Sequence, residues 1–493
     1  MSSSGRASSR AFLLATLLAG VGCAVGPDFV RPEAPPDAGY SATPSETTSV
    51  TADGTAQRLV VQQKLAADWW RVFSCPSLDA VVAEAIAHNP TVVAAQASLR
   101  RSEDNLRAGY GVFYPQLDAQ AGFSRQQYNP RKLGENLPST TFNLYTVSGS
   151  VNYTLDIWGG ERRSVEALAA SAEAQRYTLV GTYLILSSNV VNAALAQAGY
   201  RDQVLATEKL LELEKEQLSI TQTQAEAGLV PDATMLALKT TVASAEATLP
   251  PLRQKIDETD DLLAALVGRT PADWKQSSFR LKDFTLPAEL PLSLPSELVR
   301  QRPDVLTAEA QLHSANAQIG VTTAAMLPNI TLSGSFGFAS TDATQLFSPA
   351  SALWGLGAGL TQPLFHGGTL WYQNQAAIDA RDQAAASYRQ TVLAAFQQVA
   401  DTLRSLGHDA EALEAQSRAV KAAEEALQLI QINYQTGTAN YLQVLLADTQ
   451  YQQAEVGYIQ AKTQRLQDTV ALYVALGGGW WNAPATVAGL PAK

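Results

Sequence analysis

An internal duplication constrains the fold of this chain more than any other feature of its sequence. Landmarks in the first half return in the second half, in the same order and at nearly the same spacing. The paired positions are residues 89–92 and 302–305, Gly159-Gly160 and Gly367-Gly368, Gly228 and Gly437, and Gly268 and Gly477. Self-similarity at a fixed period is the sequence signature of a repeated structural unit. We therefore expect each half to form the same succession of elements: a helix, a pair of strands, a very long helix, a hairpin tip and a returning helix.

Each copy contains two segments in which apolar and polar residues alternate, as they do in half-buried strands. These segments are residues 116–127, 146–158, 329–340 and 353–365. Each reaches about 10 residues, the length of a tilted strand that crosses a bilayer. In the third segment, Leu332 lies on the apolar face and Ser333 on the polar face. A soluble β-sandwich is the alternative, but its strands average about 5–6 residues and do not lie beside helices as long as those predicted here.

Two proline-free stretches predict unusually long helices. Residues 161–225 and 369–435 each indicate one nearly continuous helix, which spans about 100 Å at the α-helical rise per residue. Val204, Leu211 and Leu218 step by seven, which is the spacing of a coiled-coil seam. Such a seam needs a partner helix, and the returning helix after each hairpin tip can supply it.

Four membrane-length strands cannot form a stable membrane structure alone. An open sheet edge is not tolerated in lipid, and the smallest bacterial barrels have about eight strands. The chain must therefore share a barrel with copies of itself. Two copies give a barrel with a filled interior, whereas three copies give twelve strands and room for a channel. The polar but uncharged faces of the predicted strands suit a water-filled lumen.

The N-terminus has the features of an export signal. Arg6 and Arg10 precede an apolar run at residues 11–21 that ends in small residues. Cys23 follows Gly22 and resembles the lipid-carrying cysteine of bacterial lipoproteins, although a plain secretory signal with an inert Cys23 is the alternative. No run of 18 or more apolar residues occurs, so we expect no transmembrane helix.

Several blocks of sequence resemble one known family. Residues 23–29, Cys-Ala-Val-Gly-Pro-Asp-Phe, resemble the mature start of outer-membrane efflux lipoproteins, and Trp69-Trp70 and residues 434–438 match later blocks. The chain is similar to the TolC/OprM outer-membrane factors, in particular to the NodT-type efflux lipoproteins. The resemblance implies a mainly helical homotrimer, with a twelve-stranded β-barrel in the outer membrane continued by a periplasmic α-barrel. It also implies two partners, a periplasmic adaptor and an inner-membrane pump of the RND type.

The sequence divides into five parts on this interpretation. They are a signal peptide (1–22), a lipid-anchored N-terminal tether (23–64), a first repeat (65–285), a second repeat (286–480) and a C-terminal tail (481–493). The tether is rich in proline, which fixes the backbone and removes hydrogen-bond donors, so we expect it to be extended. The predicted location is the outer membrane, with the lipid anchor in that membrane and the helices extending into the periplasm.

The resemblance also assigns a role to the hairpin tips. In the family, glycine-centred tips meet the adaptor, and the matching residues here are Gly228, Leu229, Gly437 and Thr438. Both glycines equally suit a plain helix ending, because glycine is favoured just past a helix C-terminus.

The helix after the second tip is the predicted location of the pore gate. Family members often carry carboxylates at the positions of Gln443 and Leu446, and neither residue is acidic here. Three Leu446 side chains that converge on the pore axis form an apolar ring, which can block ions by dewetting. We expect this constriction at Leu446, with Tyr434 helping to hold the closed helices. Two alternatives are a gate carboxylate shifted to Asp448, and a Leu446 side chain packed in a helix seam.

Signals for catalysis are absent from the sequence. The four histidines are scattered, and no metal-binding, phosphate-binding or nucleophile motif is evident, so we expect no enzyme, cofactor or bound metal. The formal net charge of -11 argues against a nucleic-acid partner. The leading hypothesis is a passive duct for drugs or other small toxic compounds. Protein secretion and metal efflux are alternatives for the same architecture, and a periplasmic coiled-coil lipoprotein scaffold without a channel is an alternative of another class.

Overall fold

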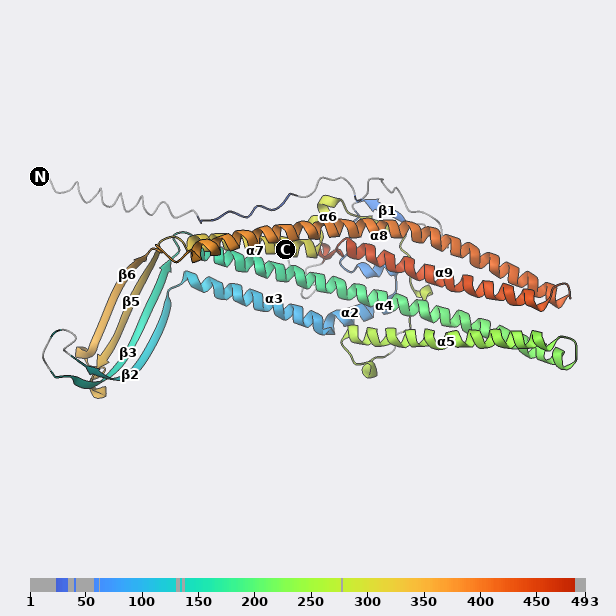
Figure 1. Ribbon diagram of the computed structural model, residues 1–493, viewed down its shortest axis with the longest axis horizontal. Coiled ribbons are helices and arrows are strands. Elements are labelled where there is room, and N and C mark those ends of the chain that lie inside the picture. The colour runs from blue at the N-terminus through green and yellow to red at the C-terminus, as the bar shows by residue number, and fades with distance from the viewer. Residues whose placement is uncertain are drawn as a thin grey trace. The chain divides into compact units, whose positions relative to one another are not determined.

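The computed structural model describes residues 24–33, 40, 57–61, 63–129, 134, 138–275 and 278–483. The predicted signal peptide, Cys23, and most of the predicted tether and C-terminal tail lie outside these ranges. Figure 1 shows the arrangement of the elements, in which long helices and long strands predominate.

The order of elements is the same in both halves of the chain, as the duplication predicts. The first half contains α2 (Pro76–His88), α3 (Pro90–Gly109), β2 (Gln116–Tyr128), β3 (Thr140–Leu155), α4 (Gly160–Glu226) and α5 (Asp232–Val267). The second contains α6 (Pro295–Gln301), α7 (Pro303–Ala324), β5 (Asn329–Ser340), β6 (Ala352–Thr361), α8 (Thr369–Gln435) and α9 (Tyr441–Ala475). The remaining elements are the short strands β1 (Arg58–Val61) and β4 (Glu289–Leu292), and the 3-10 turns η1 (Trp69–Phe73), η2 (Tyr110–Phe113), η4 (Pro271–Asp273), η5 (Leu281–Asp283), η6 (Ala343–Gln345), η7 (Pro349–Ser351) and η8 (Trp480–Asn482).

The chain forms two compact units, and each unit receives segments from both halves. Unit 1 contains residues 100–174 and 308–388 with the N-terminal segment up to residue 31, and therefore holds all four long strands. Unit 2 contains residues 32–99, 175–307 and 389–493, and therefore holds the two helical hairpins.

The long strands of unit 1 form one antiparallel sheet in the order β2-β3-β5-β6. The register places most apolar side chains of the four strands on one face: Leu117 lies opposite Val151, Tyr153 opposite Leu332, and Phe336 opposite Trp354. Exceptions at the far end of the sheet are Phe142, Leu144 and Leu353, which lie on the other face. The other face carries serine, threonine, asparagine and glycine, including the pairs Asn152 with Ser333 and Ser333 with Gly357. The predicted alternation is thus confirmed, and the sheet has one apolar and one polar face.

The ends of two strands differ from the prediction. β3 begins at Thr140, six residues before the predicted start at residue 146, because it pairs with β2 as far as Tyr128. It also ends at Leu155, because the carboxylate of Asp156 accepts hydrogen bonds from the backbone N–H groups of Glu161 and Arg162 and so begins α4. β6 ends at Thr361 rather than at residue 365, since the following Pro363 has no N–H to donate to a ladder.

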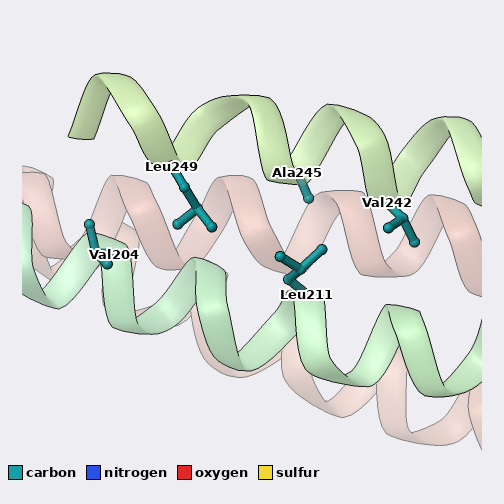
Figure 2. Close-up of a cluster of buried hydrophobic side chains, with 5 residues drawn as sticks. All are labelled: Val204, Leu211, Val242, Ala245 and Leu249. Carbon is teal, nitrogen blue, oxygen red and sulfur yellow. The ribbon is translucent and has the colours of Figure 1, made fainter. Parts of the chain in front are cut away.

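Each half of the chain contributes a hairpin of two long helices to unit 2. In the first hairpin, Val204 and Leu211 of α4 pack against α5, as Figure 2 shows. Their partners on α5 are Val242, Ala245 and Leu249. The predicted seam is therefore confirmed as a contact between the long helix and its returning partner.

One helix of the described residues, α4, is long and apolar enough to cross a membrane by length and composition alone. The sequence contains no continuous apolar run of that length, so this differs from the expectation. Half of the apolar stretch is buried inside the protein, and buried helices of soluble proteins show the same feature.

Candidate channel wall, hairpin tips and N-terminal anchor

The sheet of unit 1 has the surface of a membrane wall. Its apolar face is exposed, with Leu117 at 78% and Leu356 at 83% of their full accessible area. The outer strands β2 and β6 each pair on one side only within the described part of the chain. An exposed apolar face together with two open edges is unstable in water, and the open edges are equally unstable in lipid. Joining such sheets edge to edge around a polar interior removes the open edges, and lipid then covers the apolar outer face.

Exposed aromatic side chains lie where the strands meet the helices in unit 1. Tyr114, Phe365, Trp371 and Tyr372 are all exposed, and Trp158 lies in the same region, where its indole Nε1 donates to the carbonyl of Pro328 over 2.8 Å. Aromatic residues gather at membrane–water interfaces, because their rings are apolar and Tyr and Trp add a polar group. Sequence reasoning did not identify this group, although Trp158 and Phe365 end two predicted strands and Trp371 and Tyr372 lie in the first turn of a predicted helix.

Both hairpin tips end in the same left-handed glycine turn. Gly228 has φ of 71° and Gly437 has φ of 79°, values that residues with a Cβ rarely adopt. At the first tip, Leu229 N–H donates to the carbonyl of Gln224 over 2.9 Å, and at the second, Thr438 N–H donates to the carbonyl of Asn433 over 2.8 Å. These bonds are those of a Schellman helix ending.

The conformation of the backbone, rather than crowding, requires glycine at the tips. A Cβ placed on Gly228 or Gly437 meets nothing within 4 Å. Leu229 is 75% exposed, so the first tip presents an apolar side chain to its surroundings. The four residues predicted to meet the adaptor thus lie in two matching turns.

The predicted gate residues occupy four different environments. Gln443 closes a capping box at the start of α9, where its side chain accepts from the N–H of Asn440 over 3.0 Å. Leu446 is 56% exposed, whereas Asp448 is buried. The ring of Tyr434 lies edge-on to that of Tyr441, with 5.7 Å between centroids.

A cavity of about 640 Å³ brings two of these four residues together. Tyr434 and Asp448 both line it, whereas Gln443 and Leu446 do not. Burial raises the pKa of Asp448 to about 8, and the neighbouring carboxyl of Glu214 adds to the effect. Sequence reasoning missed Glu214, although it lies three residues after Leu211 on the same face of the helix.

The segment that follows Cys23 is extended and packs against unit 1. Val25 N–H donates to the carbonyl of Trp158 over 2.8 Å, and Asn316 Nδ2 donates to the carbonyl of Pro27 over 2.8 Å. The guanidinium of Arg163 reaches Asp28 at 2.6 Å, and the ring of Phe29 stacks on His313 with centroids 4.3 Å apart.

A close backbone approach helps to hold this segment. Gly26 has φ of 90°, and a Cβ there would lie 2.5 Å from the Cα of Gly320. The sequence predicted an extended tether here, and the contact with α7 depends on residues almost 300 positions away. No local pattern could have shown it.

The described residues offer no candidate metal centre, because no three His, Cys, Asp or Glu side chains gather among them in a way that could hold an ion.

Comparison with known proteins connects these features. The family model described as Outer membrane efflux protein matches residues 81–269 and 294–478, one stretch in each half of the chain. The chain is 31% identical to the Pyoverdine export outer membrane protein OpmQ of Pseudomonas aeruginosa over 420 residues, which are 84% of this chain and 87% of the relative. It is 27% identical over 477 residues to the Cation efflux system protein CusC of Escherichia coli, covering 94% of this chain and 97% of the relative. The solved structure of the outer-membrane channel OprN superposes with a TM-score of 0.83 at 26% identity, covering 93% of this chain and all of the other.

Proposed function

Because this chain belongs to the outer membrane efflux protein family, it is an outer-membrane efflux channel, and we propose that three copies form the passive duct of a tripartite pump. The observation that supports this most strongly is the four-stranded sheet with one apolar face, one polar face and two open edges. β2 and β6 run antiparallel to each other in the sheet order. Joining β6 of one copy to β2 of the next therefore continues the antiparallel pattern until the barrel closes at twelve strands.

The duct extends into the periplasm on this proposal, where the long helices of three copies form an α-barrel. A periplasmic adaptor docks at the tips, through Gly228, Leu229, Gly437 and Thr438. Two observations support the docking surface: the tips have the same turn, and Leu229 is exposed there. An inner-membrane pump of the RND type then supplies the energy, since the duct itself has no predicted catalytic site.

Leu446 is the residue we propose for the pore constriction. Its side chain is exposed within the chain, whereas Asp448 is buried against Glu214 and Gln443 is engaged in a helix cap. Exposure leaves Leu446 available to meet its two symmetry copies on the pore axis. Tyr434 helps to hold the closed helices, because it packs at the contact between the two hairpins.

Cys23 is the residue we propose for lipid attachment. The next residues, Ala24 to Phe29, are held against the region where strands meet helices, and Gly159 in that region lies against Ala24. The exposed aromatic side chains of the same region suit the membrane–water interface. A lipid on Cys23 would therefore enter the outer membrane close to the place where the barrel enters it.

Drugs and other small toxic compounds are the proposed cargo. OpmQ is named for pyoverdine export and CusC for cation efflux, so metal efflux is the second candidate, whereas protein secretion has no comparable support. The cargo can be assigned by deleting the gene and measuring sensitivity to antibiotics, dyes and metal salts in parallel.

Conductance in a planar bilayer tests the channel itself. The purified full chain should insert as a trimer and conduct ions. A periplasmic coiled-coil scaffold would give no conductance, and a conducting monomer would contradict the shared barrel.

A further inference from the structure

The two helical hairpins of unit 2 meet in a small apolar cluster that involves all four helices. Leu238 of α5 is buried against Tyr441 and Val444 of α9. Leu218 of α4 and Tyr434 of α8 pack around these three residues. The contact between the first hairpin and the second is therefore apolar at this level.

Two carboxylic acids continue this contact by one helical turn. Glu214 lies four residues before Leu218 on α4, and Asp448 lies four residues after Val444 on α9, so each shares a helix face with the cluster. Both are buried, Glu214 at 4% and Asp448 at 8% exposure, and both line the same cavity, where the neighbouring Glu214 carboxyl adds to the effect of burial in raising the pKa of Asp448. A buried polar pair in an apolar helix seam reduces stability, and its best-attested uses are to set register or to act as a switch.

Two neighbouring carboxyl groups can hydrogen-bond to each other only when they hold a proton. Ionised carboxylates only accept hydrogen bonds, so two of them cannot bond to each other. Gln452 Nε2 donates to Glu214 Oε1 over 3.0 Å. The other oxygen, Glu214 Oε2, is buried and has no donor among the described protein groups. A proton shared with Asp448 supplies the missing donor.

Among the described residues that line the cavity beside the pair, none is a cation that could replace this proton. The cavity beside the pair is lined on α4 by the exposed Glu216, on α8 by Tyr434, on α9 by Tyr441 and on α5 by Leu238, and no Lys or Arg is among its lining residues. The buried pair also raises the pKa of Tyr441, after burial itself. Every ionisable group that lines this cavity is thus a carboxyl or a phenol.

We propose that Glu214 and Asp448 form a proton-operated latch, which holds the first hairpin to the second and releases it when both carboxyls ionise. The helix that Asp448 holds is the one that carries Leu446, seven residues after the second tip turn ends at residue 439. The latch goes beyond the export function proposed above, because it makes the hairpin contact depend on periplasmic pH. It acts inside one chain and needs neither adaptor nor pump.

The direction of the pH effect follows from the two states of the latch. In the closed state, burial followed by the neighbouring Glu214 raises the pKa of Asp448 to about 8. In the released state the carboxyl meets water, where its pKa is about 4. The closed state therefore binds one more proton between these values, and the ratio of closed to released hairpins falls about tenfold for each pH unit. The bound proton stabilises the closed state fully below about pH 4, and this stabilisation is lost completely above about pH 8.

Spin-label distances on the full-length protein in lipid nanodiscs test the latch. Labels are introduced by Glu212→Cys and Gln450→Cys, two exposed positions on α4 and α9. We expect a longer distance to gain population as the pH is raised from 5 to 8, and no further change from 8 to 9. Asp448→Asn should abolish this dependence and keep the short distance, because the amide donates to Glu214 without a proton. Glu214→Gln should also abolish the pH dependence and keep the short distance, because its amide then donates to Asp448.

Glu216→Gln is the matched control, since it removes a carboxylate from the same cavity but from an exposed position. It should keep the wild-type pH profile. A wild-type distance that does not change with pH would overturn the proposal, as would an Asp448→Asn profile that matches wild type. If neither amide variant assembles, the wild-type spin-label distances measured from pH 5 to 9 still test the proposal.

The outcome remains distinct from that of the proposed function. Absence of conductance at every pH would contradict the channel and leave the distances to report on the latch. Conductance together with constant distances would contradict the latch alone.

Discussion

At the scale of single residues, the tips depend on two glycines whose role is conformational. Gly228 and Gly437 have positive φ, and open space surrounds the position of a Cβ at each. A substitution there is therefore strained through the backbone and not through a clash. Backbone strain at the tips can therefore be tested separately from steric clashes, because a side chain added there does not disturb the packing of the helices.

Valine and asparagine should behave differently at the tips. Gly437→Val should raise the energy of the turn by about 1–2 kcal/mol, because a β-branched residue resists the left-handed conformation. We expect export to be lost while the trimer and its outer-membrane level stay normal. Gly437→Asn should keep most of the export, since asparagine tolerates this conformation. Gly228 should show the same pattern, and drug resistance that survives both valine substitutions would show that the tips are not the docking surface.

The proposed constriction gives a second prediction at this scale. Leu446→Asp should raise single-channel conductance and cation selectivity, because three carboxylates replace an apolar ring that excludes water. Leu446→Ala is the control for the loss of bulk, and should raise conductance without selectivity. If Asp448→Asn removes an existing cation selectivity while Leu446→Asp merely weakens the trimer, the carboxylate at residue 448 forms the gate instead.

At the scale of secondary-structure elements, the polar–apolar period decided what the sequence could predict. The four strands, the two long helices and both glycine reversals could be predicted, because each depends on neighbours within a few residues. The start of β3 could not, since it depends on pairing with Tyr128 of another strand. The pairing of Glu214 with Asp448 and the docking of Phe29 on His313 were missed for the same reason: the partners are far apart in the sequence.

The two faces of the sheet lead to a prediction about one strand. Leu332→Arg places a charge on the apolar face and should impair insertion by about 2–4 kcal/mol if it lies near the bilayer midplane. Ser333→Arg, on the polar face, should leave insertion intact and alter conductance instead. Heat resistance of the trimer on a gel and single-channel recording measure the two effects. Equal effects at both positions would contradict the assignment of the faces.

At the scale of the whole molecule, the proposed function gives membrane attachment two sources, the shared barrel and the lipid on Cys23. In the proposed trimer the barrel joins four strands from each chain, whereas the proposed lipid would act through Cys23 and the docked segment that follows it. The segment is held by contacts with α4 and α7, through Arg163 and Asn316. These contacts do not depend on the lipid, so the N-terminal segment should remain docked without it.

Removing the lipid should therefore change the modification and not the assembly. Cys23→Ser should abolish the incorporation of labelled palmitate, because serine cannot carry the lipid of the bacterial lipoprotein pathway. We expect the variant still to form trimers and to conduct, since a closed barrel retains a protein in the membrane without a lipid anchor. Cys75→Ser, at the buried second cysteine, is the control and should leave labelling unchanged. Equal labelling of Cys23→Ser and wild type would exclude Cys23 as the anchor. Loss of the trimer in Cys23→Ser, with labelling abolished, would show instead that the lipid guides assembly and that the barrel does not suffice.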